Sequence, residues 1–360
     1  MTEIQTRKKN LHETQIVETS IPEISEGEIC LKVDRFAFTS NNFTYGVAGD
    51  MLGYWQFFPP KASQSQGWGI LPVWGLADVI ESKTSGIPIG ERIFGYFPPA
   101  THLKMKPVKI TDANFVDGVD HRSALPPGYN QYSRVAGESG YSPAMDDMRM
   151  LLFPLHVTSF CLHDYISSAD WFGAEQVIIV SASSKTALGL AYALHSDDTA
   201  PKVVGLTSSR NLNFVKCIGY YDEAVPYDAL GDIKNVPTAI VDLSGNTALI
   251  KTLRAQLGDD MKHCVNVGLT HWEEIDASAL IEQDERTFQF FAPGHIQKRR
   301  SDWGTAEFRK RSMGFMMKSM QSSQSWLKVK NVSGINEFSN IYQDVSDGRI
   351  PANEGVIVTI

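Results

Sequence analysis

The feature that most constrains this chain is a short apolar run that passes through a turn of small residues into a helical pattern, within residues 175–194. The apolar run, residues 177–180, is typical of a strand buried on both faces of a sheet. The alanine- and leucine-rich stretch that follows is typical of a helix. A strand, a tight turn and a helix in this order open a dinucleotide-binding βαβ unit.

The turn lacks most of the glycines that such a turn usually carries. Ser181, Ser184 and Ala187 stand three apart, where G-x-x-G-x-x-G is expected. A serine is nearly as small as glycine, and its hydroxyl can donate a hydrogen bond to a phosphate oxygen. The helix N-terminus adds backbone N–H groups and a partial positive charge for the same anion. The predicted cofactor-binding residues of the turn are Ser181, Ser183, Ser184, Lys185 and Thr186.

Two other interpretations of this turn stay open. The run Ser184 to Thr186 resembles the end of a nucleotide-triphosphate P-loop, but the first glycine of that motif would fall on Ile179, inside the strand, which leaves no room for the loop. The turn can also be a serine-rich connection that binds nothing.

Length and charge narrow the class of protein. The 360 residues suffice for two domains with their own cores. No apolar stretch is long enough for a membrane span, and the N-terminus has no signal-peptide core, so we expect a cytoplasmic protein without membrane contact. Lys and Arg number 33 against 41 Asp and Glu, and the net charge of −8 argues against a nucleic-acid partner. The cysteines form no C-x-x-C pair, which favours reduced packing residues.

The pattern of segments predicts two kinds of domain. Strands are expected at residues 177–180, 202–207, 239–243 and 263–268, and helices at residues 186–195, 211–219 and 247–257. This alternation predicts a parallel sheet covered on both faces. The first 150 residues, with strand periodicity at 28–38 and frequent Gly and Pro, predict an antiparallel β domain. A long helix is expected at 305–321, with strands at 326–330 and 355–360 that return to the first domain.

Three local motifs resemble the medium-chain dehydrogenase/reductase superfamily. They are the turn and strand at residues 89–96, the helix-to-strand passage at residues 214–227, and residues 154–159, in which Thr158 matches a nicotinamide-proximal threonine. The resemblance implies an α/β fold, with a Rossmann-type doubly wound parallel sheet inserted in a GroES-like antiparallel β domain. It places the GroES-like domain at residues 1–150, completed by 323–360, and the Rossmann-like domain at 151–322. It also implies a small-molecule substrate and the possibility of a homodimer through the cofactor domain.

Most of the chain also resembles the DUF2855 family, which implies an oxidoreductase without naming its reaction. The similar segments are residues 54–59, 130–132, 181–187, 268–272, 290–293 and 298–300.

The sequence departs from the zinc-dependent members of the superfamily. These place a Cys after the first long strand and a G-H-E segment about two dozen residues later, because zinc needs thiolate or imidazole ligands. The corresponding segments here, residues 39–45 and 72–76, contain no Cys or His. We therefore expect an enzyme that works without a metal.

The end of the second predicted strand indicates which dinucleotide binds. An NAD enzyme usually has an acidic residue there, whereas this chain has Thr207, Ser208 and Arg210. A guanidinium can pair with a 2′-phosphate through charge-assisted hydrogen bonds, so NADP(H) is the expected cofactor. Arg210 can also be an ordinary surface residue at a helix start.

A metal-free reductase needs a neutral group that stabilises charge on the substrate oxygen and then protonates the product. Tyr54 and Tyr45 lie in the loop where relatives place such groups, and Asn42 is a nearby amide donor. We predict these three as catalytic residues, with Tyr54 favoured. The same aromatic loop, which includes Trp55, is also what an ordinary lid or contact surface looks like.

The remaining predictions concern the cofactor and substrate ends of the site. In relatives, the backbone at the end of the strand that corresponds to residues 263–268 binds the nicotinamide carboxamide, which implies roles for Val267, Gly268 and Thr270. Predicted substrate or cleft residues are Trp55, Asn130, Tyr132, His271 and Phe291.

Three functions follow from these observations. The leading one is an NADPH-dependent, zinc-independent reductase of an activated C=C bond, in an enone or enoyl thioester, or of a C=O bond. The others are a protein that binds NADP(H) without turnover, as a sensor or structural ligand, and a non-redox lyase or isomerase on the same fold. The aromatic loop suits an apolar or conjugated substrate.

Overall fold

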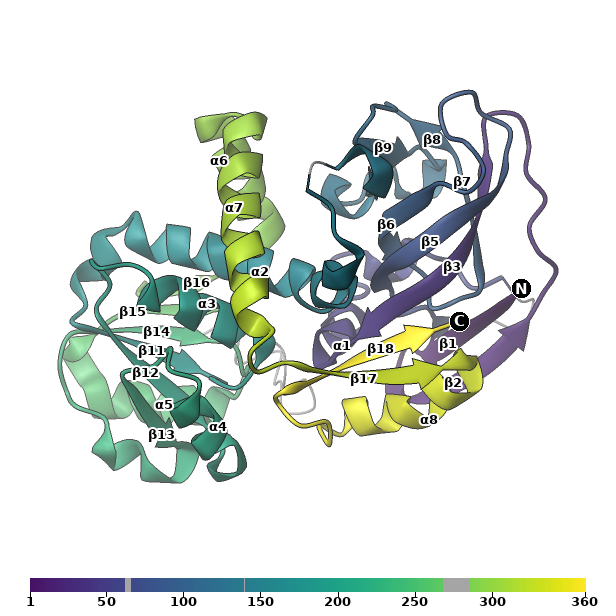
Figure 1. Cartoon of the computed structure of the whole chain (residues 1–360). Helices are drawn as coiled ribbons and strands as arrows, with labels where there is room; N and C mark the ends of the chain where they lie inside the picture. Colours follow the sequence, from purple (N-terminus) through teal and green to yellow (C-terminus); the bar gives the residue numbers. More distant parts are fainter. Residues whose placement is uncertain (62–65, 139, 268–284) are drawn as a thin grey trace. The chain divides into compact units, whose positions relative to one another are not determined.

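The computed structural model describes residues 1–61, 66–138, 140–267 and 285–360, which form two compact units (Figure 1). Unit 1 consists of Met1–Leu151 and Lys328–Ile360, and unit 2 of Leu152–Leu327. The chain passes from unit 1 to unit 2 within helix α2 (Asp146–Ser167). No helix in the described ranges has both the length and the apolar character needed to cross a membrane.

Unit 2 contains a six-stranded sheet in the order β13-β12-β11-β14-β15-β16, in which all neighbours are parallel. This is the strand order of a doubly wound dinucleotide-binding fold, so the predicted fold class is confirmed. The strands are β11 (Gln176–Val180), β12 (Lys202–Thr207), β13 (Glu223–Pro226), β14 (Thr238–Asp242), β15 (Met261–Asn266) and β16 (Thr287–Gln289). The helices after α2 are α3 (Lys185–His195), α4 (Leu212–Cys217), α5 (Thr247–Leu257), α6 (Ala292–Trp303) and α7 (Thr305–Ser323).

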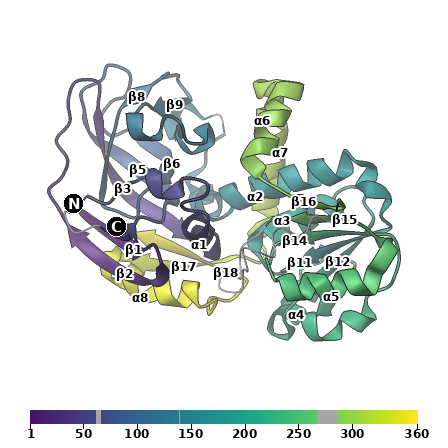
Figure 2. The same ribbon diagram turned by 180° about the vertical axis from the view of Figure 1, so that it is seen from behind.

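The alternation of side chains along β11 explains why both faces of this sheet are covered. Val177 and Ile179 pack with α2, α3 and α7 on one face, whereas Ile178 and Val180 pack with α5 on the other. Figures 1 and 2 show these helices on opposite sides of the sheet. Every residue of β11 is buried, as its continuous apolar run predicts.

Unit 1 is built mainly on antiparallel strands, and β17 and β18 form a parallel pair. Its larger sheet has the order β17-β18-β3-β5-β6-β10-β9-β8, with β7 paired to β3, and a smaller sheet has the order β2-β1-β4. The last strand, β18, pairs antiparallel with β3, with Val356 opposite Phe38, so the chain end lies in the larger sheet of unit 1. The strands are β1 (Thr2–Arg7), β2 (Asn10–Glu18), β3 (Ile29–Phe38), β4 (Trp68–Gly69), β5 (Val73–Ser82), β6 (Arg92–Phe97), β7 (His102–Met105), β8 (Pro107–Val108), β9 (Asn114–Asp117), β10 (Gln131–Arg134), β17 (Lys328–Ser333) and β18 (Glu354–Thr359), and the helices are α1 (Ser40–Val47) and α8 (Gly334–Ser346).

Close packing of α3 against α2 depends on a glycine inside α3. A Cβ atom on Gly189 would lie 2.6 Å from Ser159 Oγ and 2.7 Å from His156 Cδ2. Burial lowers the pKa of His156 to about 3, so the imidazole beside Gly189 is neutral. Ser159 Oγ also donates a 2.7 Å hydrogen bond to the carbonyl oxygen of Thr186, in the first turn of α3. Gly189 therefore lets α2 hold the start of α3.

We expect Gly189→Ala to destabilise the protein by about 1–3 kcal/mol, because the added methyl group overpacks the α2–α3 contact. The matched control is Gly314→Ala in α7, where an added Cβ has no neighbour within 4 Å. That substitution should stabilise the protein by up to about 1 kcal/mol through helix propensity. Thermal and urea unfolding, followed by circular dichroism, compare the two variants. Equal effects in both would contradict the packing explanation.

Candidate functional site

Residues 181–184 connect β11 to α3 at the carboxyl edge of the parallel sheet. We call them the phosphate turn, after their predicted role. Ser181 follows β11 directly and has a φ of +64°, in the left-handed region that favours glycine. The turn therefore keeps the backbone of a glycine at its first position, although the residue is a serine. Ser184 is the N-cap of α3, and its Oγ accepts a hydrogen bond from the backbone N–H of Ala187 at 3.3 Å. Because Oγ is the acceptor there, the Ser184 hydroxyl proton is available to donate to an anion.

A cluster of polar side chains links this turn to the end of the neighbouring strand. Ser183 Oγ accepts a hydrogen bond from Thr207 Oγ1 at 3.3 Å and another from Asn211 Nδ2 at 3.0 Å. With two donors directed at its oxygen, the Ser183 hydroxyl can donate its own proton outward. The sequence patterns do not single out Asn211 as a site residue, although its position four residues after Thr207, the last residue of the second predicted strand, was a usable signal.

Two tyrosines support the turn from the side of β13. Tyr221 Oη donates a 2.7 Å hydrogen bond to the carbonyl oxygen of Ala182. It reaches that oxygen across Gly205, where a Cβ would lie 2.8 Å from the Tyr221 ring. Burial raises the pKa of Tyr227 to about 12, although hydrogen bonds with Ser181 act in the opposite direction. Both phenols stay neutral and restrain the turn through hydrogen bonds.

Arg210 and Ser208 follow β12 at the same edge of the sheet. Ser208 precedes a short 3₁₀ helix, Ser209–Asn211, and is half-buried. Arg210 lies within this helix and is exposed. Lys185 and Thr186 are the first two residues of α3. The predicted cofactor-binding residues of the turn and of the strand end thus lie at adjacent strand ends.

The other predicted cofactor residues have different surroundings. Thr158 lies in α2, and its Oγ1 donates to the carbonyl oxygen of Pro154 at 3.0 Å. Val267 follows β15, and its N–H donates to the carbonyl oxygen of Asp242 at 2.8 Å. Gly268, Thr270 and His271 lie outside the described residues. Phe291 is the N-cap of α6, and 39% of its side chain is exposed.

In unit 1, the predicted catalytic tyrosines belong to a cluster of four phenols. Tyr45 lies in α1, Tyr54 in a 3₁₀ helix (Tyr54–Gln56), Tyr96 in β6 and Tyr129 in another 3₁₀ helix (Pro127–Tyr129). Ring centroids are 4.8 Å apart for Tyr45 and Tyr54, and 4.8 Å apart for Tyr96 and Tyr129. Trp74 packs beside them, with its centroid 5.3 Å from that of Tyr96. We call these four tyrosines the phenol cluster.

The hydroxyl groups of the phenol cluster differ in their partners. The Tyr54 and Tyr129 Oη atoms are 3.0 Å apart and share a hydrogen bond. Tyr45 Oη accepts from Trp74 Nε1 at 3.3 Å and from Asn41 Nδ2 at 3.2 Å. Tyr96 is fully buried, and its Oη has no hydrogen-bond partner within the described part of the chain. Burial raises the pKa of all four phenols, so they are protonated at neutral pH.

Asn42, the third predicted catalytic residue, bonds to the backbone on both sides of its amide. Its Oδ1 accepts from the N–H of Thr39 and its Nδ2 donates to the carbonyl oxygen of Pro72, each at 2.8 Å. It is the N3 residue of a capping box that starts α1. These contacts give Asn42 a structural role at the start of α1, the helix that carries Tyr45, where the sequence predicts a loop.

Three predicted cleft residues lie in the interior of unit 1. Trp55 is 5% exposed, and its ring fills space that a Cβ on Gly49 or Gly69 would occupy. Asn130 is buried and donates from Nδ2 to the carbonyl oxygen of Arg122 at 2.8 Å. Tyr132 is fully buried, and its Oη donates to the carbonyl oxygen of Tyr96 at 2.6 Å. All three residues thus make contacts inside unit 1, and Tyr132 bonds directly to a member of the phenol cluster.

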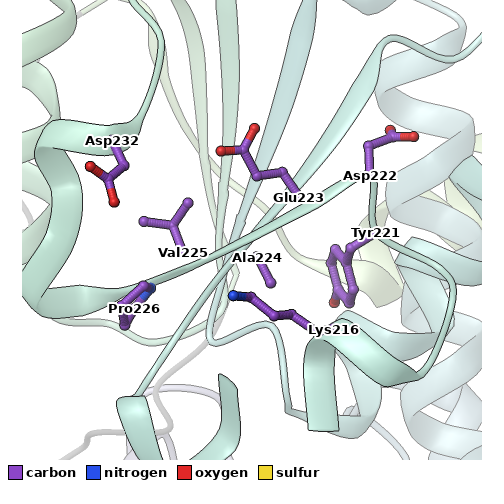
Figure 3. A pocket seen from close by; sticks show the side chains of 8 residues that line it. All are labelled: Lys216, Tyr221, Asp222, Glu223, Ala224, Val225, Pro226 and Asp232. Atoms are coloured by element: carbon purple, nitrogen blue, oxygen red, sulfur yellow. The ribbon is translucent and has the colours of Figure 1, made fainter. Parts of the chain in front are cut away.

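A surface pocket of about 430 Å³ lies along the edge strand β13. Figure 3 shows Lys216 and Tyr221 side by side next to Ala224 in this pocket. Its other lining residues are Asp222, Glu223, Val225, Pro226 and Asp232. None of the predicted site residues lines it. Within the described residues, no three His, Cys, Asp or Glu side chains are grouped as a metal site requires.

The whole chain is similar in fold to several solved structures. CurA from Vibrio vulnificus in complex with NADPH matches with a TM-score of 0.64 and 12% identity, over 100% of this chain and 99% of that one. The quinone oxidoreductase from Coxiella burnetii matches with a TM-score of 0.54 and 16% identity, over 100% and 99%. Haloferax mediterranei glucose dehydrogenase in complex with NADP, Zn and gluconolactone matches with a TM-score of 0.55 and 11% identity, over 100% and 99%.

These similarities show the fold of the chain, a doubly wound parallel sheet joined to an antiparallel β unit, which is the fold that the resemblance to medium-chain dehydrogenases/reductases implies. The family model DUF2855, described as a protein of unknown function, matches residues 36–351, and the chain belongs to this family. Comparison with curated proteins gives no match.

The left-handed backbone of Ser181 leads to a stability prediction. We expect Ser181→Gly to be more stable than Ser181→Ala by about 1 kcal/mol, because both lack the hydroxyl and only alanine places a Cβ atom in the left-handed conformation. Ser181→Val should be less stable than either, since a β-branched residue is strained further there. Urea unfolding of the three variants tests the order. An alanine variant as stable as the glycine variant would contradict it.

Proposed function

We propose that this chain is an NADPH-dependent, zinc-independent oxidoreductase that reduces an activated C=C bond of an enone or enoyl thioester, or a C=O bond, by hydride transfer. The observation that carries the proposal is the phosphate turn: a left-handed residue at the end of β11, followed by hydroxyl groups and a helix N-terminus at the carboxyl edge of a parallel sheet. Two of the similar structures hold NADPH or NADP, which supports the proposal.

The described residues fit such a cofactor. Ser183 and Ser184 have hydroxyl protons to donate to the pyrophosphate, and the start of α3 offers backbone N–H groups. Arg210 would pair with the 2′-phosphate; it lies two residues after Ser208 and three residues after Thr207, which contacts Ser183. When bound, the cofactor supplies the hydride.

Protonation of the product would fall to the phenol cluster of unit 1. Tyr54 is a neutral donor that can polarise a carbonyl and transfer its proton to the oxygen. Zinc-dependent relatives carry metal ligands in the two segments that here contain Tyr45 and Trp74, and these two side chains bond to each other. A neutral donor polarises a carbonyl less than a metal ion does, which favours a conjugated substrate whose charge is delocalised as it forms.

We expect the protein to bind NADPH at least tenfold more tightly than NADH. Arg210→Ala should weaken the binding of NADPH about tenfold and leave the binding of NADH nearly unchanged. One charge-assisted hydrogen bond accounts for an effect of this size. The control is Lys216→Ala, which removes a cation from the pocket along β13 (Figure 3). Calorimetric titration of the unmodified protein and both variants with each nucleotide measures the six dissociation constants. A protein that binds neither reduced nucleotide would overturn the proposed function.

We also expect NADPH oxidation when a panel of enones, quinones and aldehydes is offered, followed at the absorbance of the reduced nicotinamide. Tyr54→Phe should lower kcat by about a hundredfold or more with little change in NADPH affinity, as removal of a general acid does. Tyr342→Phe is the control, because it removes another buried phenol of unit 1, whose Oη donates to the carbonyl oxygen of Leu11 at 2.8 Å. Tight binding without any oxidation would favour a sensor or structural role for the nucleotide.

A further inference from the structure

The Tyr54–Tyr129 contact joins two phenols that are 75 residues apart in the chain. Their Oη atoms are 3.0 Å apart, and their rings meet edge to face with centroids 5.5 Å apart. Tyr129 also packs against the rings of Phe57 and Trp74, at 5.5 and 6.1 Å. Tyr129 is thus fixed by rings on several sides, and its hydroxyl is directed at Tyr54.

A hydrogen bond between two phenols uses one proton and leaves the other free. If Tyr129 donates, the Tyr54 oxygen is the acceptor and the Tyr54 proton can be directed elsewhere. The electrostatic balance supports this direction, because burial raises the pKa of Tyr54 while the bond to Tyr129 lowers it. For Tyr129, burial raises the pKa and the same bond raises it further. Tyr54 is therefore the phenol of the pair that loses a proton more readily.

A second observation indicates unmet hydrogen-bonding capacity beside the pair. Tyr96 Oη is fully buried and has no partner among the residues that the structure describes, and its ring centroid is 4.8 Å from that of Tyr129. Buried hydroxyl groups without a partner are rare, because the lost hydration is not compensated. An oxygen of a ligand or a bound water would compensate it.

We infer that Tyr129 is a positioning residue, whose hydroxyl donates to Tyr54 Oη, directs the Tyr54 proton towards a substrate oxygen, and stabilises the phenolate left behind. The inference rests on the proposed function. With an enone, a hydride from the reduced nicotinamide would add to the β carbon, the C=C electron pair would shift to form the C=C bond of the enol, and the carbonyl π pair would move to the oxygen. The Tyr54 O–H bond would break as an O–H bond forms on that oxygen. The nicotinamide is oxidised, the substrate is reduced to an enol that tautomerises, and water reprotonates Tyr54.

The first experiment needs no substrate. A polyfluorinated tyrosine is placed at position 54, so that its phenol titrates within the range of protein stability, and its ¹⁹F resonance is followed against pH. We expect Tyr129→Phe to lower the acidity constant of this probe about tenfold, because a hydrogen bond to the phenolate is lost. Tyr342→Phe should leave it unchanged. An unchanged titration in Tyr129→Phe, or one that also shifts in Tyr342→Phe, would overturn the inference.

The second experiment uses turnover of NADPH with the best substrate of the panel. Tyr129→Phe should lower kcat about tenfold, keep KM within about twofold and increase the solvent deuterium isotope effect, because proton transfer limits the rate more strongly. Installing 3-fluorotyrosine at position 54, a more acidic phenol, should restore part of the rate in Tyr129→Phe. If Tyr129→Phe raised KM without lowering kcat, or if 3-fluorotyrosine at position 54 did not restore any of the rate, Tyr129 would be a packing residue. Absence of NADPH oxidation by the unmodified protein would refute the proposed function, whereas the ¹⁹F titration would still decide the role of the pair.

Discussion

The junction of β11 and α3 is the constraint on which the rest of unit 2 depends. The strand is buried on both faces, so its direction is fixed, and the chain must leave it through a residue with a positive φ. That residue is Ser181, which accepts a backbone strain of about 1–2 kcal/mol that glycine would avoid. The strain is offset locally, because Tyr221 and Tyr227 bond to the turn and Ser159 bonds to the first turn of α3. Hydrogen bonds from three neighbouring elements thus offset the backbone strain that a glycine at this position would avoid.

Serine at this turn also changes the chemistry of the site. A glycine-rich turn offers an anion only backbone N–H groups, whereas this turn adds hydroxyl groups whose oxygens are already occupied by Thr207, Asn211 and Ala187. The protons of the Ser183 and Ser184 hydroxyl groups are therefore available to a ligand, and little further conformational entropy is lost in orienting them. The proposed binding of a dinucleotide uses side chains for contacts that glycine-rich relatives make with the backbone.

Much of the fold could be predicted from the sequence, because the spacing of apolar residues indicates which side chains of a strand or helix are buried. The helix at residues 247–257 has the predicted bounds, and the buried strand at 177–180 is extended by one residue. Helix α8 was not predicted, although Ile335, Phe338 and Tyr342 repeat at helical spacing and are buried. Helix α2 was not predicted either, since Pro154 lies within its 22 residues and a proline usually ends a helix.

The candidate site was predictable only where it is local in sequence. The phosphate turn could be found because strand, turn and helix are contiguous, whereas the Tyr54–Tyr129 pair joins segments whose approach depends on the packing of the whole unit. Asn42 shows the opposite difficulty. Its residue type suggested an amide donor for a substrate, but both ends of its amide bond to the backbone. Tertiary hydrogen bonds decide which polar side chains can still interact with a substrate. The spacing of residues in the sequence does not reveal these bonds.

In the proposed function, the phenol cluster supplies the group that polarises the substrate, whereas one protein of similar fold was solved with zinc bound. A metal ion polarises a carbonyl by its charge, which acts in any direction, whereas a phenol must point its proton at the oxygen. The cluster supplies that direction through the aromatic rings that fix Tyr54 and Tyr129. In the proposed function, Tyr54 would donate a proton that Tyr129 orients, and the cost of forming a buried phenolate would be met by that one hydrogen bond. A substrate that spreads its own charge by conjugation would lower this cost further, which is why the proposed function favours an enone or enoyl thioester over an isolated ketone.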